Sequence, residues 1–276
     1  MLRTILVALD NSPYTETSTA LAIEWAKRFD AKLWGLGLLN TASITRPQPV
    51  QIAGASHRNE RDAAMIVDTQ GLVQRVVAKF REQCSAADVK AEVFQDIGDP
   101  AANILRVAHR CDVVMLGKET HFHLEREEPD GTIGLVLRGC PRPITVVPRN
   151  LSAGEGVMVA YSGGKEVAHA LQTFQLLGLD RGETMHVVGV DREGWQVGEL
   201  AHLACDFLKS HDVHVEFHEL SSKASPAEVI LEQVQKLNPR MLVMGAQGYH
   251  PLRDLFTTSV TRSVLRDCPV PVFVGG

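Results

Sequence analysis

The sequence predicts an α/β protein made of two copies of a five-stranded parallel sheet covered by helices on both faces. Short apolar runs alternate with helical patterns through both halves of the 276 residues. Continuous apolar runs, such as ILVAL at 5–9, are typical of strands buried on both sides of a parallel sheet. Because parallel connections cross over with a right-handed sense, a repeated strand–helix–strand order leads to this architecture.

An internal repeat supports the division into two domains. The pattern Leu-Arg-x-Cys-Pro-x-Pro before an apolar run occurs at 137–143 and again 128 residues later, at 265–271. The segment ILVALDNS at 5–12 resembles VMVAYSGG at 157–164, at an offset of 152. The two offsets differ by 24 residues, which the first copy must carry in its middle. We therefore expect domains at 1–150 and 151–276, with the extra residues mainly in a long loop over 40–59.

The elements follow in order along each copy. Ser12 and Ser225, each followed by proline, are expected to cap helices. In the first copy we expect strands at 4–9, 32–39, 89–94, 112–116 and 143–147, and helices at 13–29, 61–86 and 99–109 with a short one before the last strand. In the second copy we expect strands at 157–161, 183–190, 213–220, 240–244 and 270–274, and helices at 163–177, 195–211, 226–237 and from 258 onward.

Composition narrows the function classes. A net charge of −5 without a long basic run argues against a nucleic-acid partner, and no apolar run is long enough to span a membrane. The first residues lead directly into a strand pattern rather than a signal peptide, which favours the cytoplasm. We expect reduced, mostly buried thiols at the five widely spaced cysteines, which are Cys84, Cys111, Cys140, Cys205 and Cys268.

The C-terminal stretch carries the pattern of a phosphate-binding loop. An apolar run at 241–244 ends at Gly245, and Gly248 follows three residues later. After nine more residues, Thr258 and Ser259 begin a helical pattern. Glycines after a strand, followed by a helix start, can bring backbone N–H groups to an anion, with Arg253 as a charge partner.

Together these features resemble the universal stress protein family in its tandem form, over nearly the whole chain. The resemblance implies two Rossmann-like domains of the adenine-nucleotide alpha-hydrolase-like type. It also implies that the last strands, 144–147 and 270–274, pair as in a dimer within one chain, with a homodimer as a further assembly. The resemblance implies a role in stress survival or signalling. Some members of the family bind ATP, and for this chain we expect ATP or another adenine nucleotide together with magnesium.

Carried over residue by residue, the resemblance favours a nucleotide site in the second domain. Ser162 stands where nucleotide-binding members have an aspartate, and Thr258 replaces a glycine, so the match is incomplete. The candidate nucleotide-binding residues of the second domain are Ser162, Gly163, Val190, Gly245, Gly248, Arg253, Thr258 and Ser259.

The first domain matches the binding pattern less well. It keeps the aspartate, but its phosphate loop lacks the second glycine, and a one-residue shift is needed to align Gly131-Thr132 with the final pair. The loop at 118–130 has a net charge of −3, and each unpaired carboxylate repels phosphate by about 1 kcal/mol or more. Nucleotide binding is not expected here; the corresponding residues are Asp10, Leu39, Gly117, Gly131 and Thr132.

Other functions stay open at this point. The alternative to a nucleotide-binding stress protein is a module that binds protein partners or another small ligand. Slow ATP hydrolysis lacks an evident general base, and we assign no catalytic residue. His121 and His123 lie among glutamates, but they favour a polar loop over a metal site, and we expect no metal. The 40–59 loop could cover a ligand, bind a partner or be a mobile insertion.

Overall fold

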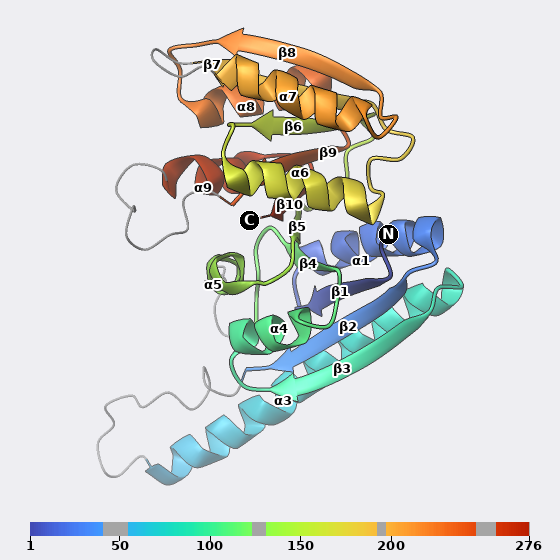
Figure 1. Cartoon of the computed structure of the whole chain (residues 1–276). Helices are drawn as coiled ribbons and strands as arrows, with labels where there is room; N and C mark the ends of the chain where they lie inside the picture. The colour runs from blue at the N-terminus through green and yellow to red at the C-terminus, as the bar shows by residue number, and fades with distance from the viewer. Residues whose placement is uncertain (41–54, 123–130, 192–196, 247–257, 276) are drawn as a thin grey trace. The chain divides into compact units, whose positions relative to one another are not determined.

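The computed structural model describes residues 1–40, 55–122, 131–191, 197–246 and 258–275 (Figure 1). The chain forms two compact units. The first is Arg3–Pro141, and the second is Arg142–Gly276 together with Met1–Leu2. The second unit thus begins before residue 151, where the sequence places the start of the second domain.

The first unit is built on a parallel sheet in the order β3-β2-β1-β4. Helices α1 and α3 pack behind this sheet and α4 in front of it in the view of Figure 1. The strands are β1 (Thr4–Leu9), β2 (Lys32–Leu39), β3 (Ala91–Ile97) and β4 (Val113–Gly117). The helices are α1 (Pro13–Phe29), α3 (Ala55–Ala86), α4 (Pro100–Ala108) and α5 (Thr132–Gly139).

The second unit repeats this plan with an added strand, in the order β5-β10-β9-β6-β7-β8. All neighbours are parallel except β5 and β10, which run antiparallel with Val146 opposite Val272. The strands are β5 (Ile144–Val147), β6 (Val157–Tyr161), β7 (Met185–Asp191), β8 (Val215–Ser221), β9 (Met241–Gly245) and β10 (Val272–Gly275). The helices are α6 (Lys165–Leu177), α7 (Val197–Lys209), α8 (Pro226–Leu237) and α9 (Thr258–Asp267). The predicted α/β architecture and the predicted pairing of the two last strands are confirmed.

Aromatic side chains pack between helix and sheet in the core of each unit. In the second unit, Phe174 of α6 meets Phe273 of β10 edge-on, with ring centroids 5.1 Å apart and neither ring exposed beyond 1%. Such a pair contributes about 0.5–1.5 kcal/mol beyond its buried area. In the first unit, Phe80 of α3 packs onto Gly35 of β2, where an added Cβ would lie 2.7 Å from the ring. The helices are therefore fixed on their sheets by shape as well as by burial.

Several predicted boundaries differ from the structure. The residues at 55–59, expected in the long loop, belong to α3, because Ala, Arg and Glu favour a helix and no proline or glycine interrupts the run from Ala55 to Gly71. The remainder of that predicted loop, beyond Asn40, lies outside the described residues. Strand β3 begins later than predicted, at Ala91.

The predicted serine caps also differ from one another. Ser225 forms a full capping box with Glu228, as the sequence suggests. Ser12 lies at the start of α1, but its hydroxyl donates to the Asp10 carboxylate instead of accepting from the helix.

Candidate functional site at the carboxyl ends of the strands

Four of the predicted second-domain residues lie at one edge of its sheet. Because β6, β7 and β9 are parallel, their carboxyl ends meet at the same edge, where a ligand of such a fold would bind. Ser162 follows β6 directly and is exposed, and Val190 is half-buried near the end of β7. Gly163 and Gly245 complete this group.

Gly163 turns the chain from β6 into α6. Its φ of 76° lies in the left-handed region, and a Cβ there would stand 2.5 Å from Leu200 Cδ1 of α7. Both the backbone conformation and the space therefore require glycine. The turn places the start of α6, the positive end of its helix dipole, at this edge of the sheet.

Close packing against α6 explains why residue 245 is a glycine. A Cβ on it would lie 2.6 Å from the backbone nitrogen of Val167, in the first turn of α6. Gly117 stands at the corresponding place in the first unit, and a Cβ there would lie 2.5 Å from Tyr14 Cβ of α1. In both copies the glycine lets the first helix approach the end of the fourth strand closely.

The phosphate half of the predicted site is only partly described. Gly248 and Arg253 lie outside the described residues. Thr258 and Ser259 are the first two residues of α9, in agreement with the predicted helix start. The structure thus brings together the strand ends and the turn after β6, while the glycine loop stays a prediction.

The corresponding edge of the first unit is filled by the protein's own chain. Asp10 is 6% exposed, and its Oδ1 accepts hydrogen bonds from the Ser12 hydroxyl at 2.6 Å and the Thr15 hydroxyl at 2.5 Å. Its Oδ2 accepts from the backbone N–H of His121 at 2.6 Å. Phe122, which follows, is 5% exposed. The segment after β4 therefore folds back onto Asp10.

The other candidate nucleotide-binding residues of the first domain lie in separate structural positions. Leu39 is buried at the end of β2, and its carbonyl accepts from the N–H of Gly98 at 3.0 Å. Gly131 precedes α5, with open space around the position of a Cβ, and Thr132 is the buried first residue of that helix. His123 and the acidic residues at 125–130 lie outside the described residues.

Comparison with known proteins identifies the family and a relative of this chain. The chain matches the universal stress protein family twice, over residues 1–148 and 155–274. It belongs to that family. The chain is 27% identical, over 293 aligned positions, to the universal stress protein Slr1230 of Synechocystis sp. strain PCC 6803, covering 98% of this chain and 99% of that protein.

Solved structures of similar proteins show the same fold. A universal stress protein from Archaeoglobus fulgidus DSM 4304 superposes with a TM-score of 0.73 at 20% identity, covering 99% of this chain and 97% of that one. Protein PA1789 from Pseudomonas aeruginosa PAO1 has a TM-score of 0.55 at 16% identity, covering 99% and 92%. Both likenesses extend over the two family domains.

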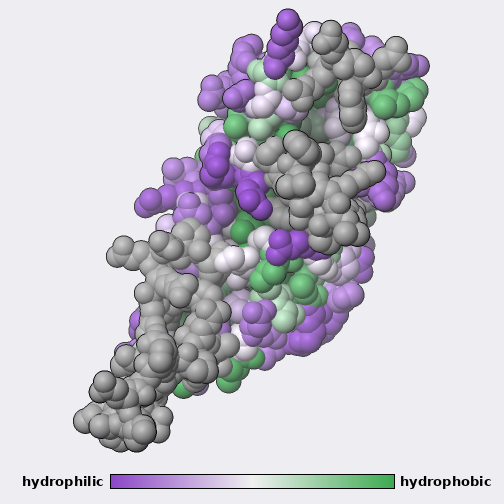
Figure 2. Space-filling view, turned by 90° about the vertical axis from the view of Figure 1, so that its left-hand side faces the viewer, coloured by the Kyte–Doolittle hydropathy of each residue, from purple (hydrophilic) through white to green (hydrophobic). Residues whose placement is uncertain are grey.

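The surface offers two further observations. Figure 2 shows the side toward which the arrowheads of β6 and β8 point in Figure 1, and its described atoms mix hydrophobic and hydrophilic residues. None of the described helices is long and apolar enough to cross a membrane.

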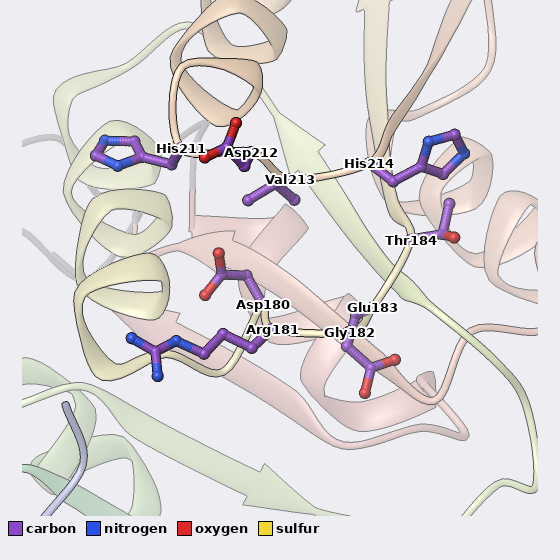
Figure 3. Close-up of a pocket in the computed structure, with 9 residues that line it drawn as sticks. All are labelled: Asp180, Arg181, Gly182, Glu183, Thr184, His211, Asp212, Val213 and His214. Atoms are coloured by element: carbon purple, nitrogen blue, oxygen red, sulfur yellow. The ribbon is translucent and has the colours of Figure 1, made fainter.

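A depression of about 480 Å³ lies at the opposite end of the second unit's strands (Figure 3). The loop before β7 and the loop before β8 line it, and Asp180 and Val213 point into the space between them. It is remote from Ser162 and Val190, because the carboxyl ends of parallel strands lie at the other edge. The hollow is thus not the predicted nucleotide site.

One group of polar side chains escaped the sequence analysis. His186 on β7 lies beside Glu216 and His218 on β8, with one donor atom of each within 4.8 Å of the others. The signal was present in the sequence, because His-x-Glu-x-His at 214–218 places its polar residues on one face of a strand.

Proposed function

We propose that this protein is a stress-response regulator that binds an adenine nucleotide, with magnesium, at the carboxyl edge of its second domain. The observation that carries the proposal is the difference between the two copies at this edge. In the first copy the edge is occupied by the protein itself, whereas in the second the corresponding residues are accessible.

The contrast is clear at equivalent positions. Asp10 and Leu39 are 6% and 4% exposed, and the backbone of His121 binds the carboxylate of Asp10. In the second domain Ser162 is exposed and Val190 is only half-buried. Of the described residues, Ser162 offers an exposed side chain to a ligand, whereas in the first domain a ligand would have to displace the segment at 121–122 to reach Asp10.

The polar groups at the carboxyl edge of the second domain are of the kinds that bind a nucleotide. The Ser162 hydroxyl can donate and accept a hydrogen bond from a ribose or a base. The start of α6 presents N–H groups, and α9 begins at Thr258, after the predicted glycine loop. Gly248, Ser259 and Arg253 are the residues we assign to the phosphates, with magnesium neutralising part of their charge.

The same evidence supports a second candidate function, binding of a protein or of another small ligand. Ser162 lacks the carboxylate that nucleotide-binding relatives use, and the packing of Gly245 on α6 explains that glycine without a ligand. On this hypothesis the fold presents loops to a partner, and nucleotide has no effect. All five cysteines are thiols, which is typical of a reducing compartment such as the cytoplasm, where either function would operate.

Nucleotide binding can be measured directly. The purified protein is denatured, and the supernatant is assayed for ATP, ADP and AMP; the protein without ligand is then titrated calorimetrically with magnesium ATP. We expect one binding site per chain. Replacing Gly248 with valine should weaken binding at least about tenfold, because a side chain would stand where the backbone approaches phosphate.

Two further variants sharpen the test. Ser162→Asp restores the carboxylate and should tighten binding by roughly tenfold, the worth of one hydrogen bond to a charged group. Gly131→Ala in the first domain is the matched control, since open space surrounds that position, and it should leave binding unchanged. If no nucleotide co-purifies and neither the natural protein nor Ser162→Asp gives a binding signal, the proposal is wrong and the interaction module remains.

A further inference from the structure

Two histidines and a glutamate form a compact group on the outer two strands of the second unit. We call His186, Glu216 and His218 the histidine–glutamate cluster. The register of β7 and β8 brings them together, because His186 lies opposite Glu216 and Val188 opposite His218. Residues two apart on a strand point to the same face, so all three side chains project from one side of the sheet.

The opposite face of β8 is occupied by a helix. Phe217, between Glu216 and His218, contacts the ring of His202 on α7, with centroids 4.1 Å apart. The cluster therefore lies on the side of β8 away from α7. Glu216 is half-exposed, with 51% of its side chain accessible, whereas the side chains of His186 and His218 are 14% and 25% exposed. A small ion could reach the cluster from solvent and meet two partly sheltered imidazoles.

The distances match the ligand spacing of a tetrahedral metal ion. Nδ1 of His186 lies 3.2 Å from Nε2 of His218 and 3.3 Å from Oε2 of Glu216. The remaining side, from Nε2 of His218 to the same oxygen, is 3.9 Å. Two ligands of a tetrahedral zinc ion, with bonds of about 2.0–2.1 Å, stand roughly 3.3–3.4 Å apart. Two of the three separations agree, and the accessible glutamate can shorten the third by a small rotation.

The chemistry of the cluster also suits a metal. Histidine binds metals through the lone pair of an imidazole nitrogen, and the cluster offers two such nitrogens. Glu216 supplies one negative charge toward a dication.

We propose that the histidine–glutamate cluster is a binding site for a divalent first-row transition metal, with zinc as its preferred ion. Nδ1 of His186, Nε2 of His218 and a carboxylate oxygen of Glu216 are the ligands, and a fourth position faces solvent. Imidazole ligands select such ions over magnesium and calcium, which prefer oxygen ligands. The site is therefore distinct in chemistry from the magnesium that would accompany a nucleotide.

The position of the site gives the metal a structural consequence. His186 is the second residue of β7, four residues before Val190, so the cluster lies about 13 Å along the strand from the proposed nucleotide edge. Strand β8 ends the sheet of this unit, and a metal would cross-link it to β7. Binding to the folded state alone would then stabilise the edge strand by mass action. The proposal is independent of nucleotide binding.

His214 lies near the cluster, directly before the first residue of β8. Its Nε2 is 4.0 Å from Oε1 of Glu216, the carboxylate oxygen that does not face the other two histidines, and its side chain is 73% exposed. It also lines the depression of Figure 3, where its ring is drawn turned away from the hollow. We do not count it as one of the three ligands, and its replacement provides a graded comparison.

Zinc binding to the full chain is the direct test. Metal is removed with a chelator under reducing conditions, and zinc is titrated in competition with a chromophoric zinc indicator. We expect one zinc per chain and a rise in Tm of roughly 5 °C at saturating zinc, with no rise from magnesium. Cobalt substitution should give the visible absorption of a tetrahedral ion with nitrogen and oxygen ligands.

Substitutions at the cluster and beside it distinguish the proposed metal ligands from neighbouring residues that do not bind the ion. Glu216→Gln, at a half-exposed position, should weaken zinc binding at least tenfold, and His218→Gln by about 100-fold or more. Glu219→Gln is the matched control, because Glu219 is exposed on the same strand but faces the α7 side, and it should change nothing. His214→Gln should have a smaller effect than His218→Gln.

Three results would overturn the site. One is the absence of zinc binding by the folded natural protein; another is unchanged binding in both Glu216→Gln and His218→Gln. The third is a cobalt spectrum with thiolate charge-transfer bands, which would assign the metal to cysteines. In each case the cluster would be a hydrogen-bonded group only. Circular dichroism of each variant shows that loss of binding is not loss of fold.

Discussion

Asp10 and Ser162 occupy equivalent places in the two copies, directly after the first strand. In the first copy the carboxylate is tied to the turn through Ser12 and Thr15 and to the distant backbone of His121. In the second copy the shorter serine side chain is exposed. The residue that matches the nucleotide-binding pattern is thus engaged by its own domain, and the residue that departs from it is accessible.

Cys84 is the residue whose burial has the clearest consequence for stability. It lies at the end of α3 with 1% of its surface exposed, and burial raises the pKa of its thiol from 9.0 to about 11. In the unfolded chain the thiol ionises first, so the unfolded state gains stability as the pH rises. Between about pH 9 and 11 we expect this group to remove roughly 2–3 kcal/mol from the free energy of unfolding.

The measurement is urea unfolding of the natural protein and of Cys84→Ala at pH 8 and pH 10.5. The variant should lose less stability between the two pH values, whatever its stability at pH 8. Burial also raises the pKa of Cys205 and Tyr161, so the comparison uses the difference between the two proteins. Equal losses in both proteins would show that Cys84 ionises normally in the folded state.

At the scale of elements, close approach of a helix to a strand end recurs in both copies. Gly117 meets α1 and Gly245 meets α6, each with no room for a Cβ. The sequence alone supports two explanations for these glycines, a phosphate loop and a tight contact. The structure demonstrates the contact in both units, and it leaves the phosphate role to Gly248 and the start of α9.

Gly245→Ala should destabilise the protein by about 1–3 kcal/mol, because the added methyl group would lie 2.6 Å from the backbone nitrogen of Val167 and force α6 away from β9. Gly134→Ala in α5 is the matched control. No atom lies within 4 Å of its added Cβ, so it should stabilise the helix by up to about 1 kcal/mol. Thermal unfolding of both variants checks this, and an unchanged Tm for Gly245→Ala would show that α6 yields without cost.

At the scale of the whole molecule, strand β5 belongs to the sheet of the second unit although it ends the first sequence repeat. It runs antiparallel to β10, with Thr145 opposite Phe273, and both residues are fully buried. The pairing covers the outer edge of β10. An uncovered strand edge offers unpaired N–H and C=O groups to other chains.

Two fragments of the second unit, one with β5 and one without it, should therefore differ in self-association. A fragment covering 142–276 keeps β5 on β10 and should self-associate less than one without β5 in size-exclusion chromatography with light scattering. A fragment covering 151–276 lacks β5, leaves β10 as an edge strand, and should self-associate as its concentration rises. Identical monomers from both fragments, each folded by circular dichroism, would show that β5 is not needed to protect this edge.

The two-copy α/β architecture could be predicted from the sequence, because it depends on local apolar periodicity and on a repeated Cys-Pro-x-Pro segment, whereas the β5–β10 pairing was implied by the family resemblance. The start of α3 at Ala55 could not, since a polar stretch next to Pro47, Pro49 and Gly54 reads as loop while its residues favour a helix. The candidate site was predicted only in part. Its strand ends and turn are where the pattern places them, and its glycine loop remains a prediction.

Local patterns in the sequence were enough to indicate the family, the order of strands and helices, and the residues at the carboxyl edge of each sheet. The contacts that engage Asp10 and those that form the histidine–glutamate cluster become visible only in the folded chain. Asp10 and His121 are 111 residues apart, and His186 meets Glu216 across two strands. Such contacts depend on strand register and on the path of the chain after each strand, which no local pattern of side chains specifies.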